Sequence, residues 1–142
     1  KIMINDLENI GIGVDLRTYE FGIFYNDIKT GNFQIYSLTW PAIPDPDLFQ
    51  YTFHSNSVPP NGANRGFYNN KEVDDLIDLS RKSINLDERR GYYNKIQSIL
   101  ADELPYIFLW HEDYTLAINE NVKGYKIHPV GSFIHLRDAL IE

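Results

Sequence analysis

Asp45 and Asp47 stand on either side of Pro46, a spacing that could bring two carboxylates together for general acid–base chemistry. An aspartate before a proline, with Pro44 as its other neighbour, is also a good turn former. No nearby residue would raise the pKa of one carboxylate selectively. We therefore interpret this tripeptide as a turn and expect no catalytic residue in it.

The other residue types that support chemistry lack the spacing it needs. None of the four histidines, His54, His111, His128 and His135, lies three or four residues from another histidine or from a suitably paired carboxylate on one helix face. The chain has no cysteine, no G-x-S-x-G frame, no G-x-G-x-x-G and no phosphate-binding loop motif. The sequence thus predicts no metal, no cofactor and no enzymatic activity.

Binding residues are easier to find than catalytic ones. Trp40 ends a predicted buried strand at the edge of a proline-rich segment, which is where open α/β sheets place ligands. A tryptophan that closes the core would fit the same pattern. Asn61 and Arg65 lie in a glycine-containing loop, where they either project from an ordered backbone or merely accompany flexible glycines.

The elements that would position these residues alternate in type. Apolar periodicity predicts helices over 2–10, 21–29, 70–82 and 86–104, and strands over 12–19, 33–40, 106–110 and 114–118. Asn69 with Glu72 and Asn85 with Glu88 fit capping boxes at the starts of the last two helices. Segment 41–69 is proline-rich and irregular, but its aromatic residues favour an ordered loop. The order of the elements indicates an α/β layer structure.

The composition of the chain limits the kinds of partner that it could bind. The 142 residues carry a net charge of −7 with scattered positive residues, which argues against nucleic-acid binding. Hydrophobic residues make up 43% of the chain, enough for a folded core, and no apolar run approaches the ~20 residues that span a bilayer. Lys1-Ile2 precede Met3 in what reads as a helix, so we expect the chain to begin within a longer protein.

A series of short segments runs through the whole chain in a recognisable order. They include Trp40-Pro-Ala-Ile-Pro-Asp-Pro-Asp-Leu-Phe49, Asn61-Gly-Ala-Asn-Arg-Gly-Phe-Tyr-Asn69, Asn70-Lys-Glu-Val-Asp-Asp-Leu-Ile77, Ala101-Asp-Glu-Leu-Pro-Tyr-Ile-Phe-Leu109 and Asn121-Val-Lys-Gly-Tyr125. In this order and at these spacings they resemble the family 5 extracellular solute-binding proteins, the peptide- and nickel-type receptors of ABC transporters. The single motifs are weak, but together they are specific.

The resemblance implies a two-lobed, type II periplasmic-binding-protein-like fold with a mixed sheet flanked by helices. Residues 1–120 would form most of the C-terminal ligand-binding lobe, and residues 121–142 would return toward an N-terminal lobe outside this chain. The receptor would capture a small-molecule or oligopeptide ligand and deliver it to an ABC transporter permease. It would act in the periplasm or another extracytoplasmic space, either free or lipid-anchored through its N-terminus.

In peptide-binding relatives, an aromatic residue that matches Phe21 and the tryptophan that matches Trp40 line the cavity. The candidate ligand-binding residues are Phe21, Thr39, Trp40, Pro41, Ile43, Asn61, Arg65 and Tyr68.

The chain departs from those relatives after its tryptophan. They hold the peptide amine with an aspartate three residues on, where this chain has Ile43, and its loop is one residue shorter. Pro41 also has no N–H for strand-like pairing with a peptide. Loss of a charge-assisted contact to a buried amine would cost about 1.5–3 kcal/mol. A nickel chelate or another non-peptide solute therefore stays open, whereas a hydrolase using Asp45 or Asp47, or a stand-alone interaction domain, is less favoured.

Overall fold

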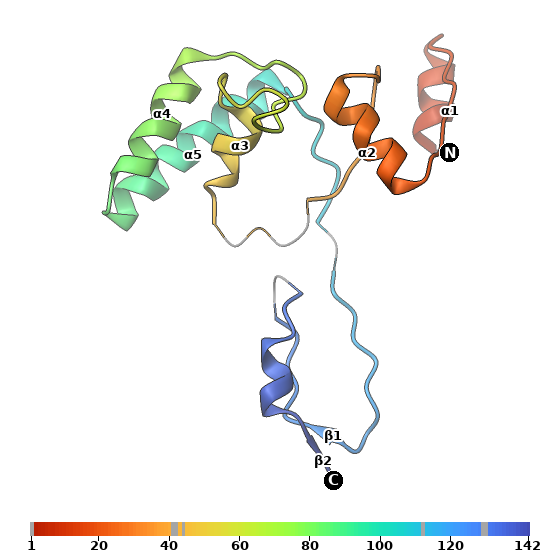
Figure 1. Cartoon of the computed structure of the whole chain (residues 1–142), viewed down its shortest axis with the longest axis vertical. Helices are drawn as coiled ribbons and strands as arrows, with labels where there is room; N and C mark the ends of the chain where they lie inside the picture. Colours follow the sequence, from red (N-terminus) through yellow and green to blue (C-terminus); the bar gives the residue numbers. More distant parts are fainter. Residues whose placement is uncertain (1, 41–42, 44, 112, 129–130) are drawn as a thin grey trace. The chain divides into compact units, whose positions relative to one another are not determined.

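The computed structural model of the protein describes residues 2–40, 43, 45–111, 113–128 and 131–142, and it divides into two compact units, residues 1–34 and 35–142 (Figure 1). The first unit holds α1 (Ile2–Asn9) and α2 (Phe21–Thr30). The second unit holds α3 (Leu48–Phe53), α4 (Lys71–Lys82), α5 (Leu86–Glu103), β1 (Val122–Lys123), the 3₁₀ helix η1 (Ile134–Asp138) and β2 (Leu140–Ile141).

In the first unit, local hydrogen bonds define α2. The Glu20 carboxylate accepts from the backbone N–H groups of Gly22 and Ile23, which satisfies two free donors of the first turn. Gly31 ends the helix in the left-handed region at φ 77°, a conformation that costs glycine little. The predicted helices over 2–10 and 21–29 are thus confirmed to within a residue at each end.

In the second unit, α4 and α5 form an antiparallel hairpin (Figure 1). The Asn85 side chain accepts from the N–H groups of Asp87 and Glu88, which confirms the predicted cap of α5. The predicted cap of α4 was wrong by one residue, because Asn70, not Asn69, accepts from the first turn of the helix. Near the turn between the helices, the Ser83 hydroxyl donates to the Glu88 carboxylate at 2.8 Å.

The core lies between α4, α5 and α3. Along α4, Val73, Leu76, Ile77 and Ser80 are buried, and α5 meets them with three buried side chains. The core residues are Phe53, Val73, Leu76, Ile77, Tyr93, Ile96 and Leu100. Leu104, which follows α5, is exposed, because the helix ends there in a left-handed residue before Pro105.

Residues 45–69 of the proline-rich segment contain a helix that the sequence did not predict, α3. Beyond α3, the amide of the buried Asn64 donates to the carbonyls of His54 and Tyr68. Its carbonyl accepts from the Tyr68 N–H at 2.8 Å. One side chain thus satisfies backbone groups from both sides of the loop, which explains how an irregular stretch keeps a single conformation.

The predicted strands over 12–19, 33–40, 106–110 and 114–118 are wrong as strands. In the described residues these segments have no ladder partner, and the only sheet is the antiparallel pair β1–β2, with Val122 opposite Ile141. A strand needs a neighbour for its backbone groups, and alternation of residue types does not supply one. Within the described part of the chain, no helix has both the length and the apolar character needed to cross a membrane.

Candidate functional site

Four side chains of the second unit form what we call the tryptophan–arginine cluster: Tyr36, Trp40, Tyr51 and Arg65. The guanidinium carbon of Arg65 lies 5.9 Å from the centroid of the Trp40 ring and 5.8 Å from that of Tyr36. Tyr51 meets Trp40 edge to face, with 6.2 Å between ring centroids. The cluster joins residues from the segment before the proline-rich stretch, from α3 and from the loop after it.

The loop that carries Arg65 is fixed by its backbone. The Ala63 N–H donates to the Tyr51 carbonyl at 2.8 Å, which ties the loop to α3. A Cβ on Gly62 would overlap the carbonyl of Ser57, so only glycine fits this approach. The Tyr106 hydroxyl donates to the Ala63 carbonyl at 2.9 Å. These contacts hold the loop from which the Arg65 guanidinium lies over the Trp40 ring.

The surroundings of Arg65 determine what it can do. Arg65 is only 5% exposed, and its guanidinium lies over the rings of Tyr36 and Trp40. Burial raises the pKa of Tyr106, and so does its hydrogen bond to Tyr36. A cation between two π systems is held by attraction to both ring faces. Arg65 therefore supports Trp40, which remains half-buried and presents indole surface for contact with an apolar or planar group.

The remaining predicted site residues lie in several places. Phe21 opens α2 in the first unit, is 63% exposed and stacks on Tyr25 with 5.8 Å between centroids. Thr39, Ile43 and Asn61 are exposed in the second unit. Pro41 lies outside the described residues. Among the described candidates of the second unit, the structure brings Trp40 and Arg65 into contact.

Tyr68 points to the end of α5. Its hydroxyl donates to the Glu103 carboxylate at 2.5 Å, and the Asn70 amide donates to the other oxygen of the same carboxylate at 2.7 Å. Burial and the neighbouring negative charge raise the pKa of the Tyr68 phenol. This arrangement ties the loop and the start of α4 to the end of α5, so the Tyr68 hydroxyl has a structural partner.

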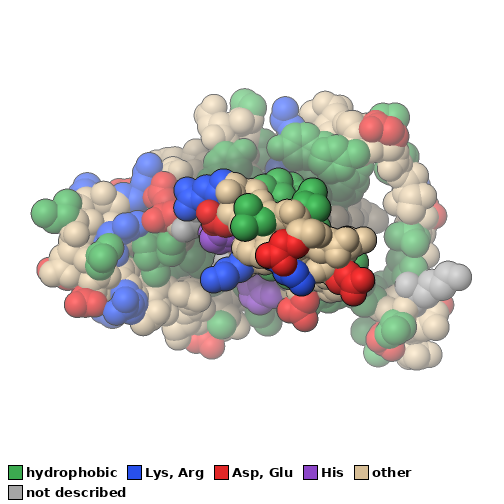
Figure 2. Space-filling model, turned by 90° about the horizontal axis from the view of Figure 1, so that it is seen from below, with side chains coloured by type: hydrophobic (Ala, Val, Ile, Leu, Met, Phe, Trp, Pro, Cys, Tyr) green, Lys and Arg blue, Asp and Glu red, His purple; other side chains and the backbone are tan. Residues whose placement is uncertain are grey.

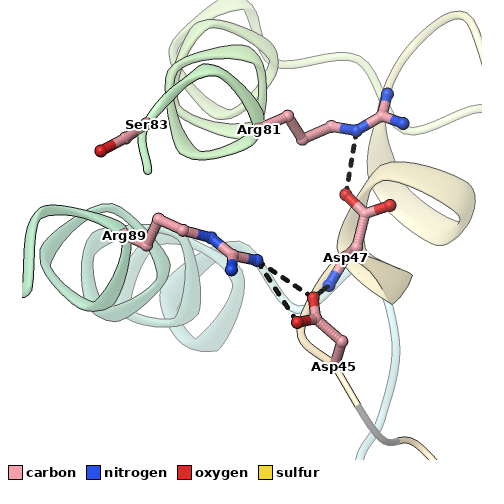
Figure 3. A pocket seen from close by; sticks show the side chains of 5 residues that line it. All are labelled: Asp45, Asp47, Arg81, Ser83 and Arg89. Atoms are coloured by element: carbon pink, nitrogen blue, oxygen red, sulfur yellow. Dashed lines mark hydrogen bonds and ion pairs between the residues drawn. The ribbon is translucent and has the colours of Figure 1, made fainter. Parts of the chain in front are cut away.

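The Asp45-Pro46-Asp47 tripeptide is a turn, as predicted. The Asp47 N–H donates to the Asp45 carboxylate at 2.8 Å, and each carboxylate pairs with an arginine (Figure 3). Arg89 lies 3.2 Å from Asp45, and Arg81 lies 2.9 Å from Asp47. Together with Ser83 these residues line an open pocket of about 480 Å³. Since its two positive and two negative charges are matched, the pocket offers no excess charge to a ligand.

The histidines and the charged surface were compared with what metal ions and nucleic acids require. His54 is buried between Asp74 and Asp78 at 3.7 and 3.6 Å, but across the described ranges no three metal-ligating side chains gather around one point. On the face drawn in Figure 2, acidic and basic side chains are interspersed, with apolar side chains among them. A mixed surface of this kind lacks the basic stripe that a nucleic acid requires.

Two members of the cluster were missed by the sequence analysis. Tyr36 precedes Trp40 by four residues in a segment read as a strand, where it gave no sign of a contact with the distant Arg65. Tyr51 belongs to the unpredicted α3. The abundance of aromatic residues around the prolines was the one available signal, and it indicated order without indicating partners.

The chain is similar to known proteins along almost its whole length. It is 31% identical over 128 residues to the probable D,D-dipeptide-binding periplasmic protein DdpA of Escherichia coli, covering 89% of this chain and 25% of the relative. It is 26% identical over 135 residues to the nickel-binding protein NikA of Staphylococcus aureus, covering 94% and 27%. No protein-family model matches the chain.

The fold is also that of a known receptor. The oligopeptide-binding protein AppA from Bacillus subtilis, solved in complex with a nonapeptide, superimposes with a TM-score of 0.76 at 24% identity, covering 99% of this chain and 28% of AppA. The predicted fold class, a fragment of a two-lobed type II receptor, is thereby confirmed. These relatives are binding proteins, and the chain spans about a quarter of their length. Along almost its whole length, the chain is similar to the family 5 extracellular solute-binding proteins.

Proposed function

We propose that this chain forms the greater part of the C-terminal lobe of an extracytoplasmic receptor that captures a peptide-like or other small polar solute for import by an ABC transporter. The observation that carries the proposal is the tryptophan–arginine cluster, in which a buried cation and an aromatic edge hold a half-exposed indole in place. A rigid aromatic surface costs little entropy when it meets a ligand, which suits a site that binds without chemistry.

The assignment of segments follows from this proposal. Residues 1–120 belong to the ligand-binding lobe, and residues 121–142 return toward the N-terminal lobe. The described residues that follow α5 expose apolar side chains, with Ile107 81% and Trp110 70% exposed. An apolar surface of this kind is normally covered by a partner. Strands of the same lobe that lie outside this chain would cover it and supply the missing ladder partners.

The transport partners are likewise proposed. A periplasmic relative supports an extracytoplasmic location, a permease as the downstream partner and an N-terminal lobe that closes on the ligand. Anchoring by a lipid at the N-terminus is an alternative to a freely diffusing receptor. The candidate residues of the second unit are proposed to contact the ligand, with Trp40 as the central contact, and the roles of Phe21 and Pro41 stay predictions from the sequence.

A nickel chelate is the second candidate ligand. Ile43 stands where peptide-binding relatives carry the amine-binding aspartate, and one relative is a nickel-binding protein. The absence of an acidic residue at this position favours a ligand without a free amine at that place. This alternative keeps the same receptor function and changes only the solute.

The test is a binding screen on the complete gene product. Isothermal titration calorimetry with L-Ala-L-Ala, D-Ala-D-Ala, trialanine, a nonapeptide and the Ni²⁺–histidine complex would identify the solute class. Trp40→Ala is expected to weaken binding by at least tenfold, because a buried aromatic contact contributes about 2 kcal/mol or more. Leu86→Ala, which removes an exposed apolar side chain at the start of α5 away from the cluster, is the control. Equal affinity in wild type and Trp40→Ala would place the site elsewhere, and turnover of a peptide that Asp45→Asn abolishes would favour a hydrolase.

A further inference from the structure

The turn at Asp45–Asp47 joins the candidate site to the two longest helices. Asp45 pairs with Arg89 of α5, and Asp47 pairs with Arg81 of α4 (Figure 3). The two carboxylates are held in one arrangement, because the Asp47 N–H donates to Asp45. One short turn thus contacts both helices of the hairpin through separate ion pairs.

Arg81 and Arg89 belong to α4 and α5, two helices that pack against each other in the core. The buried side chains of α4 and α5 interlock in the core, with Val73 and Ile96 fully buried. Arg89 also lies over the Tyr93 ring at 5.8 Å. The arginines therefore extend from a packed scaffold toward a turn that contributes no core residue itself.

The turn leads directly into α3, the helix that carries the Tyr51 ring in contact with Trp40. Asp47 is the residue before α3, and α3 carries Tyr51, whose ring meets Trp40 edge to face. The backbone carbonyl of Tyr51 also accepts the Ala63 N–H of the Arg65 loop. A shift at the start of α3 would displace two of the contacts that hold the indole.

We propose that Asp45 and Asp47, paired with Arg89 and Arg81, are positioning residues that fix α3 and thereby the ligand-contacting face of Trp40. This inference rests on the proposed receptor function. Ion pairs that are partly exposed contribute little to overall stability. Their effect is instead local, since they select one position of the turn among those that its prolines allow.

The structure offers variants that separate position from charge. Asp45→Asn/Asp47→Asn removes both pairs with little change in volume. Asp47→Arg/Arg81→Asp reverses one pair and restores the attraction. Asp75→Asn breaks a matched surface pair, Lys71–Asp75 on α4, that does not involve the turn.

The first readout needs no ligand. Fluorine NMR of the complete gene product, labelled with 5-fluorotryptophan, identifies the Trp40 resonance as the one lost in Trp40→Phe. The Asp45→Asn/Asp47→Asn variant is expected to shift or broaden that resonance. In the matched Asp75→Asn variant the resonance should stay in place. In an Asp47→Asn variant it should move partway, and the Asp47→Arg/Arg81→Asp exchange should return it toward the wild-type position.

The second readout is affinity for D-Ala-D-Ala and trialanine by calorimetry. Binding is expected to weaken by about fivefold in the doubly substituted variant, because the competent position would be populated for a smaller fraction of the time. Asp75→Asn should bind as wild type does. An unmoved Trp40 resonance would overturn the positioning role whatever the ligand is. A moved resonance with unchanged affinity would overturn its link to binding, whereas a wild-type protein that binds neither peptide would refute the peptide proposal itself.

Discussion

Replacement of Arg65 by methionine would remove the cation from between the Tyr36 and Trp40 rings while keeping much of the aliphatic volume of the side chain. Each cation–π contact contributes about 0.5–1 kcal/mol when exposed and about 2 kcal/mol when desolvated. Arg65 is buried, so two contacts predict a loss of about 2–4 kcal/mol in the free energy of unfolding.

The contact itself can be isolated with a double-mutant cycle. Arg65→Met, Tyr36→Leu and the combined variant would be compared with wild type by urea unfolding of the complete gene product, followed by circular dichroism. We expect a coupling energy of about 1 kcal/mol between the two positions. Lys95→Met removes a positive charge from an exposed position of α5 and should change stability by less than about 0.5 kcal/mol.

A coupling energy below about 0.3 kcal/mol would refute the reasoning, because independent sites add within that margin. A loss for Lys95→Met as large as that for Arg65→Met would refute it in another way. It would show that net charge, and not the position of the guanidinium between the rings, determines the effect.

Two further outcomes are expected. Gly62→Ala should lower the free energy of unfolding by about 1–3 kcal/mol, since its methyl group would overlap the Ser57 carbonyl, and Gly66→Ala, at an open position, is the control in thermal unfolding. The pKa of Tyr68 is raised by burial and by Glu103, so the stabilisation from its protonated hydroxyl is complete below about pH 10 and is lost as pH rises above that value toward the raised pKa. Urea unfolding between about pH 9 and 11 should therefore show a steeper loss of stability for wild type than for Tyr68→Phe, and parallel curves would contradict this assignment.

The helices could be predicted because their signals are local. The start of α5 follows from one asparagine and the apolar spacing behind it, and the face of α4 from Val73 to Ser80 follows from periodicity alone. The six residues of α3 were missed because prolines precede them and so short a helix shows no full period. The strand predictions were wrong for a different reason. Alternation shows which side chains are apolar, but a ladder depends on a partner segment, which a local pattern does not reveal.

The candidate site shows the same limit. Trp40 and Arg65 were proposed separately, from the end of an apolar run and from a glycine-containing loop, and the structure brings them together. Their contact with Tyr36 and Tyr51 depends on how the loop returns across α3, which involves the buried Asn64 and the close approach at Gly62. The arginine partners of Asp45 and Asp47 lie more than thirty residues away in sequence, so a turn propensity could be recognised while its anchors could not.

Side-chain bonds close the α4–α5 hairpin at both of its ends, since Ser83 meets Glu88 near the turn and Asn70 meets Glu103 at the opposite end. A helix pair joined only by its turn frays from the open end, one residue at a time. With both ends joined, the cheapest opening is release of the pair as one cooperative unit. Proteases would accordingly encounter this region either intact or fully open, and its amide hydrogens would exchange as one group with a common opening free energy.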